Sequence, residues 1–176
     1  MNRHHEPLMR WAMPFLPASP SSDVLDVGCG GGVMLEKLAV RYPDAKLTGV
    51  DISMTSVKAS SERNSKLMEA GRLRVDVGSV SDLPYEKESF DIMTAVETYY
   101  FWPDLEMDIK SAATRLRCGG TMMIVAETYE RPDLAEQNAR YARDFGVKIV
   151  SNETMVSFME KAGIGGLASI FFNLIT

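Results

Sequence analysis

Short apolar runs alternate along the chain with longer segments in which apolar residues recur every three or four positions. The runs contain few polar residues, which is typical of strands covered on both faces of a sheet. Strands that alternate with helices in this way predict an α/β protein with a mostly parallel, twisted sheet and helices on both faces. The predicted strands span residues 24–27, 46–50, 73–77, 90–96, 121–126 and 167–172.

Helical periodicity and helix-ending residues define the segments between these strands. Near the N-terminus, Pro14 and Pro17 should stop a first helix, because proline inside a helix removes a hydrogen bond and clashes with the preceding turn. Pro103 fits the first position of a later helix. Further helices are predicted at 32–42, 54–70, about 104–116, before Gly146 and after Ser151, with a turn at 118–120.

Composition adds limits on class and partners. With 176 residues and 45% hydrophobic content, the chain suits one compact domain with a real core. A net charge of −5 gives no basic footprint for nucleic acid, so we expect no nucleic-acid partner. No apolar run reaches the ~18–20 residues of a membrane span. Cys29 and Cys118 show no metal or redox spacing, which favours free thiols in a reducing cytoplasm.

The most informative segment is the glycine-rich turn that follows the first predicted strand. Gly28 and Gly30 would let the chain turn sharply and bring its backbone against a ligand. Asp51 ends the next strand, and its two carboxylate oxygens suit the paired hydroxyls of a ribose. In a parallel sheet both features lie at the carboxyl ends of the strands, where ligands bind. The sequence therefore predicts a site for a nucleoside-bearing ligand.

The details of this turn favour a cationic ligand over a pyrophosphate. Val33 stands where the dinucleotide fingerprint requires its third glycine, and no lysine–serine or lysine–threonine pair of a phosphate-binding loop follows the turn. Asp26, just before the turn, would place a negative charge beside a pyrophosphate. The same charge would attract a positively charged group.

At this point the chain resembles the class I S-adenosylmethionine-dependent methyltransferases, and most closely the type found in ubiquinone and menaquinone biosynthesis. Residues 24–32 resemble the first motif of that family, and Asp51 matches its ribose-binding acid. The similarity runs from about residue 23 to 127, and five motifs occur in the family's order. The three later motifs are residues 78–85 after the third strand, 89–93 in the fourth strand and 116–120 before the fifth.

The resemblance implies a three-layer Rossmann-like sandwich. It also implies one domain with an N-terminal lid or helix (1–22), a cofactor-binding core (23–127) and C-terminal helices with a last strand (128–176). Relatives end in an antiparallel strand pair. Here that pair is expected to be incomplete, since only the strand at 167–172 is clear and residues 173–176 are too short for the second.

The resemblance also implies which residues hold the cofactor. Ser79 departs from the family, where many members carry an aspartate, so its contact to the adenine amino group is expected to be weaker. The implied cofactor residues are Asp26, Gly28 and Gly30 for the methionine part, Asp51 for the ribose, Ile52, Ser79 and Val80 for the adenine, and Val96 for a carbonyl toward the methionine amino group.

Candidates for the acceptor side follow the fourth strand and precede the first helix. Tyr99, Tyr100 and Trp102 could line an acceptor pocket or stabilise a sulfonium by cation–π contact, or could simply cover the core. Glu97 is interpreted as a structural carboxylate. His5 lies in the lid segment, where it could act as a base at neutral pH or be merely exposed. No residue is compelled to act as the base.

The sequence therefore predicts methyl transfer from S-adenosylmethionine to a small organic acceptor by in-line displacement, with S-adenosylhomocysteine as product. No Asn/Asp-Pro-Pro-Tyr/Phe run follows the fourth strand, which disfavours enzymes that methylate amino groups of nucleic acids. We expect no metal and either a monomer or a homodimer. Two alternatives stay open: a non-catalytic module that binds S-adenosylmethionine, and an NAD-dependent oxidoreductase.

Overall fold

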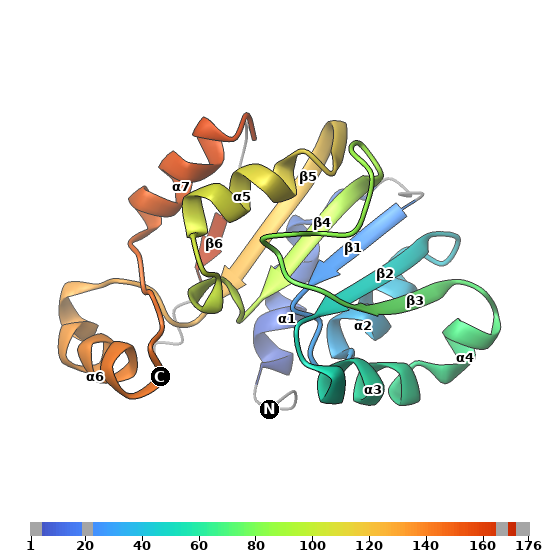
Figure 1. Ribbon diagram of the computed structural model, residues 1–176, viewed down its shortest axis with the longest axis horizontal. Coiled ribbons are helices and arrows are strands. Elements are labelled where there is room, and N and C mark those ends of the chain that lie inside the picture. Colours follow the sequence, from blue (N-terminus) through green and yellow to red (C-terminus); the bar gives the residue numbers. More distant parts are fainter. Residues whose placement is uncertain (1–4, 19–22, 165–168, 172–176) are drawn as a thin grey trace.

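The computed structural model describes residues 5–18, 23–164 and 169–171. Within these residues six parallel strands form one sheet in the order β3-β2-β1-β4-β5-β6 (Figure 1). The strand order reverses between β1 and β4, which pair side by side. The strands are β1 (Asp23–Val27), β2 (Lys46–Asp51), β3 (Leu73–Val77), β4 (Phe90–Val96), β5 (Leu116–Ala126) and β6 (Ser169–Phe171).

Helices cover both faces of this sheet, so the predicted α/β class with a parallel sheet is confirmed. α1 and α2 pack on one face, and α5 and α7 pack on the other (Figure 1). The α-helices are α1 (Glu6–Ala12), α2 (Val33–Arg41), α3 (Met54–Arg63), α4 (Ser65–Glu69), α5 (Leu105–Ala113), α6 (Ala135–Phe145) and α7 (Asn152–Lys161). Short 3₁₀ turns occupy Met13–Phe15 (η1), Tyr99–Phe101 (η2) and Pro132–Leu134 (η3).

The central strands are apolar because both of their faces are buried. Val24 and Leu25 are neighbours in β1, and both are fully buried. Successive side chains of a strand point to opposite faces. Val24 accordingly packs in the core under α1 and α2, whereas Leu25 packs in the core under α5 and α7. Every helix in the described part of the chain falls short of the length and apolar character that a bilayer span demands.

The prediction of one continuous helix at 54–70 is wrong. α3 ends at Arg63 and α4 begins at Ser65, and the backbone of Asn64 between them leaves the helical region at φ −105° and ψ 24°. The Asn64 side chain donates to the carbonyls of Ser60 (3.0 Å) and Gly32 (3.1 Å). The second bond ties the junction to the glycine turn, and this tertiary contact outweighs the helical propensity of the segment.

The predicted helix end at Leu116 and the predicted turn at 118–120 are also wrong. α5 ends at Ala113, and β5 runs from Leu116 to Ala126 with a register shift opposite β4. Gly119 has φ +78°, so these residues form an irregularity inside the strand rather than a turn before it. Pro103 precedes the helix instead of opening it, because Asp104 is the N-cap and accepts from the Met107 N–H at 3.2 Å.

The chain's two end regions follow the predictions in part. α1 ends at Ala12, and the 3₁₀ turn that contains Pro14 follows it, so the predicted stop is confirmed. α6 ends at Gly146 and α7 begins after its cap Ser151, as predicted. β6 lies parallel to β5. The outer residues of the predicted strand at 167–172, and the antiparallel partner expected to be missing at 173–176, lie outside the described residues.

Candidate functional site

The turn after β1 can be built only with glycine at its key positions. Gly28, Gly30 and Gly32 have φ values of +69°, +53° and +77°, which side chains rarely adopt. A Cβ atom on Gly28 would lie 2.3 Å from the Thr98 hydroxyl oxygen, and one on Gly32 would lie 2.4 Å from the Asn64 amide nitrogen. The turn therefore presents backbone rather than side chains at the carboxyl end of β1.

Asp51, at the end of β2, is fixed against this turn. Its Oδ2 atom accepts from the Gly30 N–H at 2.9 Å, and its Oδ1 atom accepts from the Ser53 N–H at 2.9 Å. Ser53 in turn caps α3 by accepting from the Ser56 N–H. Each carboxylate oxygen can accept more than one hydrogen bond, so both oxygens keep capacity for a ligand. The half-exposed carboxylate can therefore accept bonds from two neighbouring hydroxyls.

Asp26 lies beneath the turn and is only 2% exposed. Burial, with a further contribution from the charge of Asp51, raises its pKa to about 7, although the hydrogen bond from the Thr94 hydroxyl at 2.6 Å opposes this rise. A positive charge placed nearby would favour the ionised carboxylate. The electrostatics of Asp26 thus suit a cationic ligand.

The residues predicted to hold the adenine surround the end of β2. Ile52 is 77% exposed beside Asp51, which leaves its apolar side chain free to cover a flat ring. Val80 is buried, and the Ser79 hydroxyl oxygen accepts from the Ser81 N–H at 3.2 Å. The Gly78 N–H donates to the Asp51 carbonyl at 3.0 Å, which places this segment directly against the ribose candidate.

The predicted aromatic group after β4 divides into two kinds of environment. Tyr99 and Trp102 are buried in the core under α5, and the Tyr99 hydroxyl donates to the Thr128 carbonyl at 2.9 Å. Burial raises the pKa of the Tyr99 and Tyr100 hydroxyls, so both stay protonated. Tyr100 is only partly buried, and its hydroxyl donates to Glu97 at 2.7 Å. Tyr100 is thus joined by a hydrogen bond to an acidic group.

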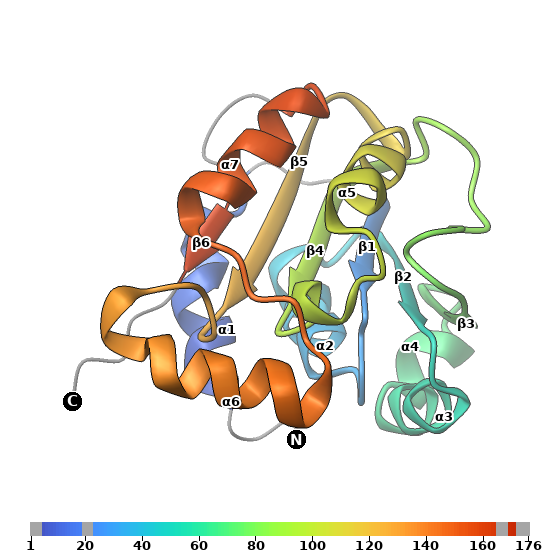
Figure 2. The same ribbon diagram turned by 60° about the vertical axis from the view of Figure 1, so that its left-hand side comes forward.

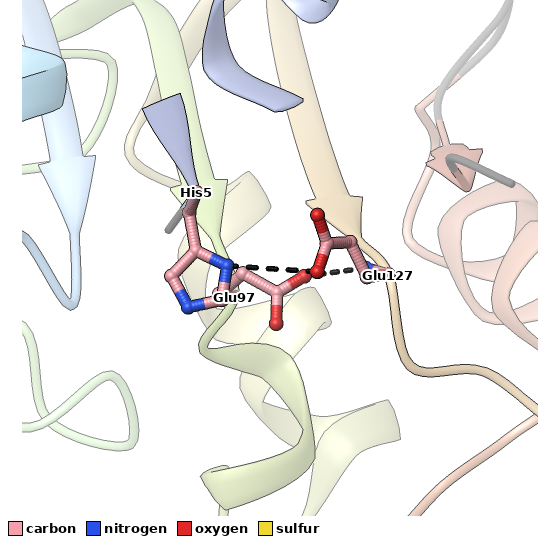
Figure 3. Close-up of side chains that lie close together, drawn as sticks. All are labelled: His5, Glu97 and Glu127. Carbon is pink, nitrogen blue, oxygen red and sulfur yellow. Dashed lines mark hydrogen bonds and ion pairs between the residues drawn. The ribbon is translucent and has the colours of Figure 1, made fainter. Parts of the chain in front are cut away.

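Glu97 begins a small cluster that includes the predicted candidate His5 (Figure 3). Its backbone has φ +56°, a left-handed conformation that is uncommon for glutamate. Its carboxylate accepts from the Tyr100 hydroxyl and from the backbone N–H of Glu127, while burial raises the pKa of that carboxylate. His5 is half-buried, with its Nδ1 atom 3.8 Å from the Glu127 carboxylate. The structure thus brings together one predicted residue and two glutamates.

Sequence reasoning treated Glu97 only as a structural residue and missed Glu127. A signal was available, because each glutamate directly follows the last apolar residue of a long predicted strand. Adjacent parallel strands end at the same edge of a sheet, so acids at these positions lie together. Thr94 and Thr98 were also missed. Their contacts with Asp26 and Gly28 depend on strand register, which a single sequence does not show.

Fold and site together define an α/β protein of the nucleoside-binding type. The glycine turn and the ribose candidate lie beside the point where the strand order reverses, which is where such sheets bind ligands. This strand order also serves dinucleotide enzymes, so the fold alone does not choose the cofactor.

Comparison with known proteins makes that choice. Residues 24–120, more than half of the chain, match the family model described as a methyltransferase domain. The chain belongs to this family, that of the class I S-adenosylmethionine-dependent methyltransferases.

Named relatives point in the same direction. The chain is 31% identical to the O-methyltransferase cnsE of Penicillium expansum over 150 residues, which cover 84% of this chain and 54% of the relative. It is 36% identical to a ubiquinone biosynthesis O-methyltransferase of Xanthomonas campestris over 108 residues, which cover 61% and 44%. The chain therefore spans only about half the length of the curated relatives it matches.

A solved structure confirms the fold. A geranyl diphosphate methyltransferase, solved in complex with S-adenosylmethionine, superposes with a TM-score of 0.80. The aligned region covers 91% of this chain and 65% of that protein at 20% identity. The Rossmann-like α/β sandwich expected from the sequence is thus the fold of this chain.

Proposed function

We propose that this chain binds S-adenosylmethionine and transfers its methyl group to a small organic acceptor. The observation that carries the proposal is the Asp51 carboxylate, which is bound to the Gly30 N–H across the carboxyl ends of β1 and β2. Its free acceptor positions suit the ribose hydroxyls. Buried Asp26 lies under the same turn, and a cationic methionine part placed there would favour its ionised form.

The proposed contacts follow the predicted assignment. Gly28 and Gly30 would approach the methionine part through backbone, with Asp26 beneath them and the Val96 carbonyl beside them. Ile52 would cover one adenine face. Ser79 and Val80 would lie at the adenine edge, where the Ser79 hydroxyl is already engaged with the Ser81 N–H.

The chemistry we propose is an in-line displacement. A lone pair of the acceptor forms a bond to the methyl carbon while the carbon–sulfur bond breaks and its electron pair passes to sulfur. S-adenosylhomocysteine leaves as a neutral thioether, and a hydroxyl acceptor loses its proton to solvent or to a base. The sulfonium is already activated, so the protein acts mainly by alignment and exclusion of water. Alignment can lower a barrier by several kcal/mol, up to ~7–11.

The acceptor class rests on the relatives rather than on a geometry within the site. Two matched relatives are named O-methyltransferases, so a hydroxyl group on a small organic molecule is the acceptor we propose. Tyr100, Glu97 and His5 stand at the edge where an acceptor would meet the methyl group.

The two alternatives make different predictions. A non-catalytic module would bind S-adenosylmethionine and transfer no methyl group, whereas an oxidoreductase would bind NAD. Family membership does not favour either of them.

We also propose the predicted division of the domain at residues 22 and 127, a cytoplasmic location that suits the two free thiols, and a monomer or homodimer.

Titration calorimetry with S-adenosylmethionine and NAD tests the proposal. We expect the wild type to bind S-adenosylmethionine and not NAD. Asp51→Ala should weaken S-adenosylmethionine binding at least tenfold, because hydrogen bonds to a charged group contribute about 1.5–3 kcal/mol each. Asp51→Asn should lose less affinity for S-adenosylmethionine than Asp51→Ala, since asparagine keeps one acceptor oxygen. The control is Asp44→Ala, which removes an exposed acid that precedes the other end of β2.

Binding of NAD alone, or an unchanged affinity in Asp51→Ala, would refute the cofactor assignment. A screen of small hydroxyl compounds with a radiolabelled methyl donor then separates enzyme from binding module. Incorporation of label into at least one compound is expected. Binding without any incorporation would favour the non-catalytic alternative.

A further inference from the structure

Three side chains from distant parts of the chain meet at the carboxyl edge of β4 and β5. Glu97 directly follows β4 and Glu127 directly follows β5, and the two strands pair with Val96 opposite Val125. His5 directly precedes α1. Figure 3 shows the three side chains converging on one point. One ligand atom from each lies within 4.8 Å of the other two.

The second observation is the environment of the His5 Nδ1 atom. The His5 Nδ1 atom is buried and has no hydrogen-bond partner among the described residues. Its distance of 3.8 Å to the Glu127 Oε2 atom is too long for a hydrogen bond. A buried polar atom left unsatisfied costs free energy, so a missing partner is the simplest explanation.

The charges around this atom favour the binding of a cation. Glu97 and Glu127 bring two carboxylates together, and in the described ranges no lysine or arginine forms an ion pair with either. The Glu97 carboxylate is oriented by the Tyr100 hydroxyl and the Glu127 N–H. Hydrogen bonds of this kind commonly orient metal-binding carboxylates.

From these observations we infer that His5, Glu97 and Glu127 form a divalent metal site, although the sequence analysis expected no metal. Two atoms that share one ion at about 2.1 Å can lie up to ~4.2 Å apart, which accommodates the 3.8 Å contact. A pair at the 4.8 Å limit would come within this range by a small side-chain rotation. One imidazole and two carboxylates favour Mn²⁺, Fe²⁺ or Zn²⁺ over Ca²⁺, which takes oxygen ligands.

The site lies beside the proposed methyl donor. Thr98 follows Glu97 in the chain, and its hydroxyl is the atom that a Cβ on Gly28 would meet at 2.3 Å. Three protein ligands leave coordination positions open, as in catalytic metal sites. The ion would supply a Lewis acid that lowers the pKa of an acceptor hydroxyl. This role rests on the proposed function and narrows the acceptor to one whose oxygen can bind a metal.

Metal binding is tested without reference to activity. The full chain is stripped with a chelator and titrated with MnCl₂, and free Mn²⁺ is counted by electron paramagnetic resonance. We expect one equivalent to bind. His5→Ala and Glu127→Gln should each weaken Mn²⁺ affinity at least tenfold, while Glu130→Gln, an exposed glutamate three residues further along, should not change it. Circular dichroism checks that each variant is folded.

Two results would refute the proposed metal site. One is that the wild type binds no stoichiometric Mn²⁺, and the other is that Glu130→Gln and Glu127→Gln lose Mn²⁺ affinity equally. Competition with ZnCl₂ should release bound Mn²⁺ and so raise the signal of free Mn²⁺, because such ligands have a higher affinity for Zn²⁺. S-adenosylmethionine binding measured on the same samples separates the two proposals. Cofactor binding without Mn²⁺ binding refutes only the metal site, and the reverse result refutes only the proposed function.

Discussion

At the scale of single residues, Asp26 shows how the fold changes the chemistry of a side chain. The same residue type at Asp44 is exposed. Asp26 is buried with one hydroxyl partner, so its charged form is disfavoured and its pKa rises to about 7. The sequence identified the residue as a candidate, but its titration depends on burial that only the fold creates.

Asp26→Asn should stabilise the protein more at pH 8 than at pH 5. The folded chain holds a proton at Asp26 up to about pH 7, whereas an ordinary aspartate with a pKa of 3.8 has lost it. The native state therefore binds more protons between these values, and the unfolding free energy falls as pH rises through that window. Asparagine does not titrate, so the variant does not lose this stability as pH rises.

Urea unfolding at both pH values measures the effect. We expect the free-energy difference between Asp26→Asn and wild type to grow by about 2–3 kcal/mol from pH 5 to pH 8. The exposed control Asp44→Asn should show no such growth. A difference for Asp26→Asn that stays constant with pH would show that the buried carboxyl titrates normally.

At the scale of elements, sequence patterns located most strands and helices but missed two irregularities. β3 and β4 have the predicted bounds, because their apolar runs reflect burial on both faces. The break between α3 and α4 and the irregularity at Gly119 depend on partners elsewhere, namely the carbonyl of Gly32 and the register of β4. The candidate site divides in the same way. Asp51 could be predicted from a local sequence motif, whereas His5 comes close to Glu127 only in the folded chain.

Asn64→Ala tests whether the α3–α4 break supports the glycine turn. The substitution should lower the unfolding free energy by about 1–3 kcal/mol, because it removes two buried hydrogen bonds and leaves the Gly32 carbonyl without its side-chain donor. Alanine has the better helix propensity, so a purely local effect would instead stabilise the segment.

Chemical denaturation measures this change, with Ser65→Ala as the neighbouring control. Ser65 is exposed, so its substitution should change stability by less than ~0.5 kcal/mol. Weaker S-adenosylmethionine binding in Asn64→Ala alone would support the link to the cofactor turn. A gain in stability for Asn64→Ala would contradict it.

At the scale of the whole molecule, the two ends of the sheet have different roles. At the amino end, Arg117 of β5 binds Asp23 of β1 at 2.9 Å and Asp91 of β4 at 2.8 Å. At the carboxyl end lie the glycine turn, Asp51 and the left-handed Glu97. The chemistry is thus proposed at the carboxyl end, beside the glycine turn and Glu97, while ion pairs join the strands at the opposite end.

α6 lies at the carboxyl end of the sheet and is loosely attached to it. Figure 2 shows this helix beyond the ends of β4 and β5. Asn138 is its one buried residue, and its amide donates to the Tyr129 carbonyl at 2.8 Å. In contrast, α5 buries Leu105, Asp108, Ile109 and Ala112. Local opening costs least where few apolar groups are buried.

Hydrogen exchange should therefore distinguish the two helices. We expect the amides of α6 to exchange at least tenfold faster than those of α5 in the free protein, as measured by mass spectrometry of peptides. Asn138→Ala should speed exchange in α6 further, because it removes the bond to Tyr129, whereas the exposed neighbour Gln137→Ala should not. Equal protection of α5 and α6 would contradict this account, because it would require α6 to be held by contacts that the described structure does not contain.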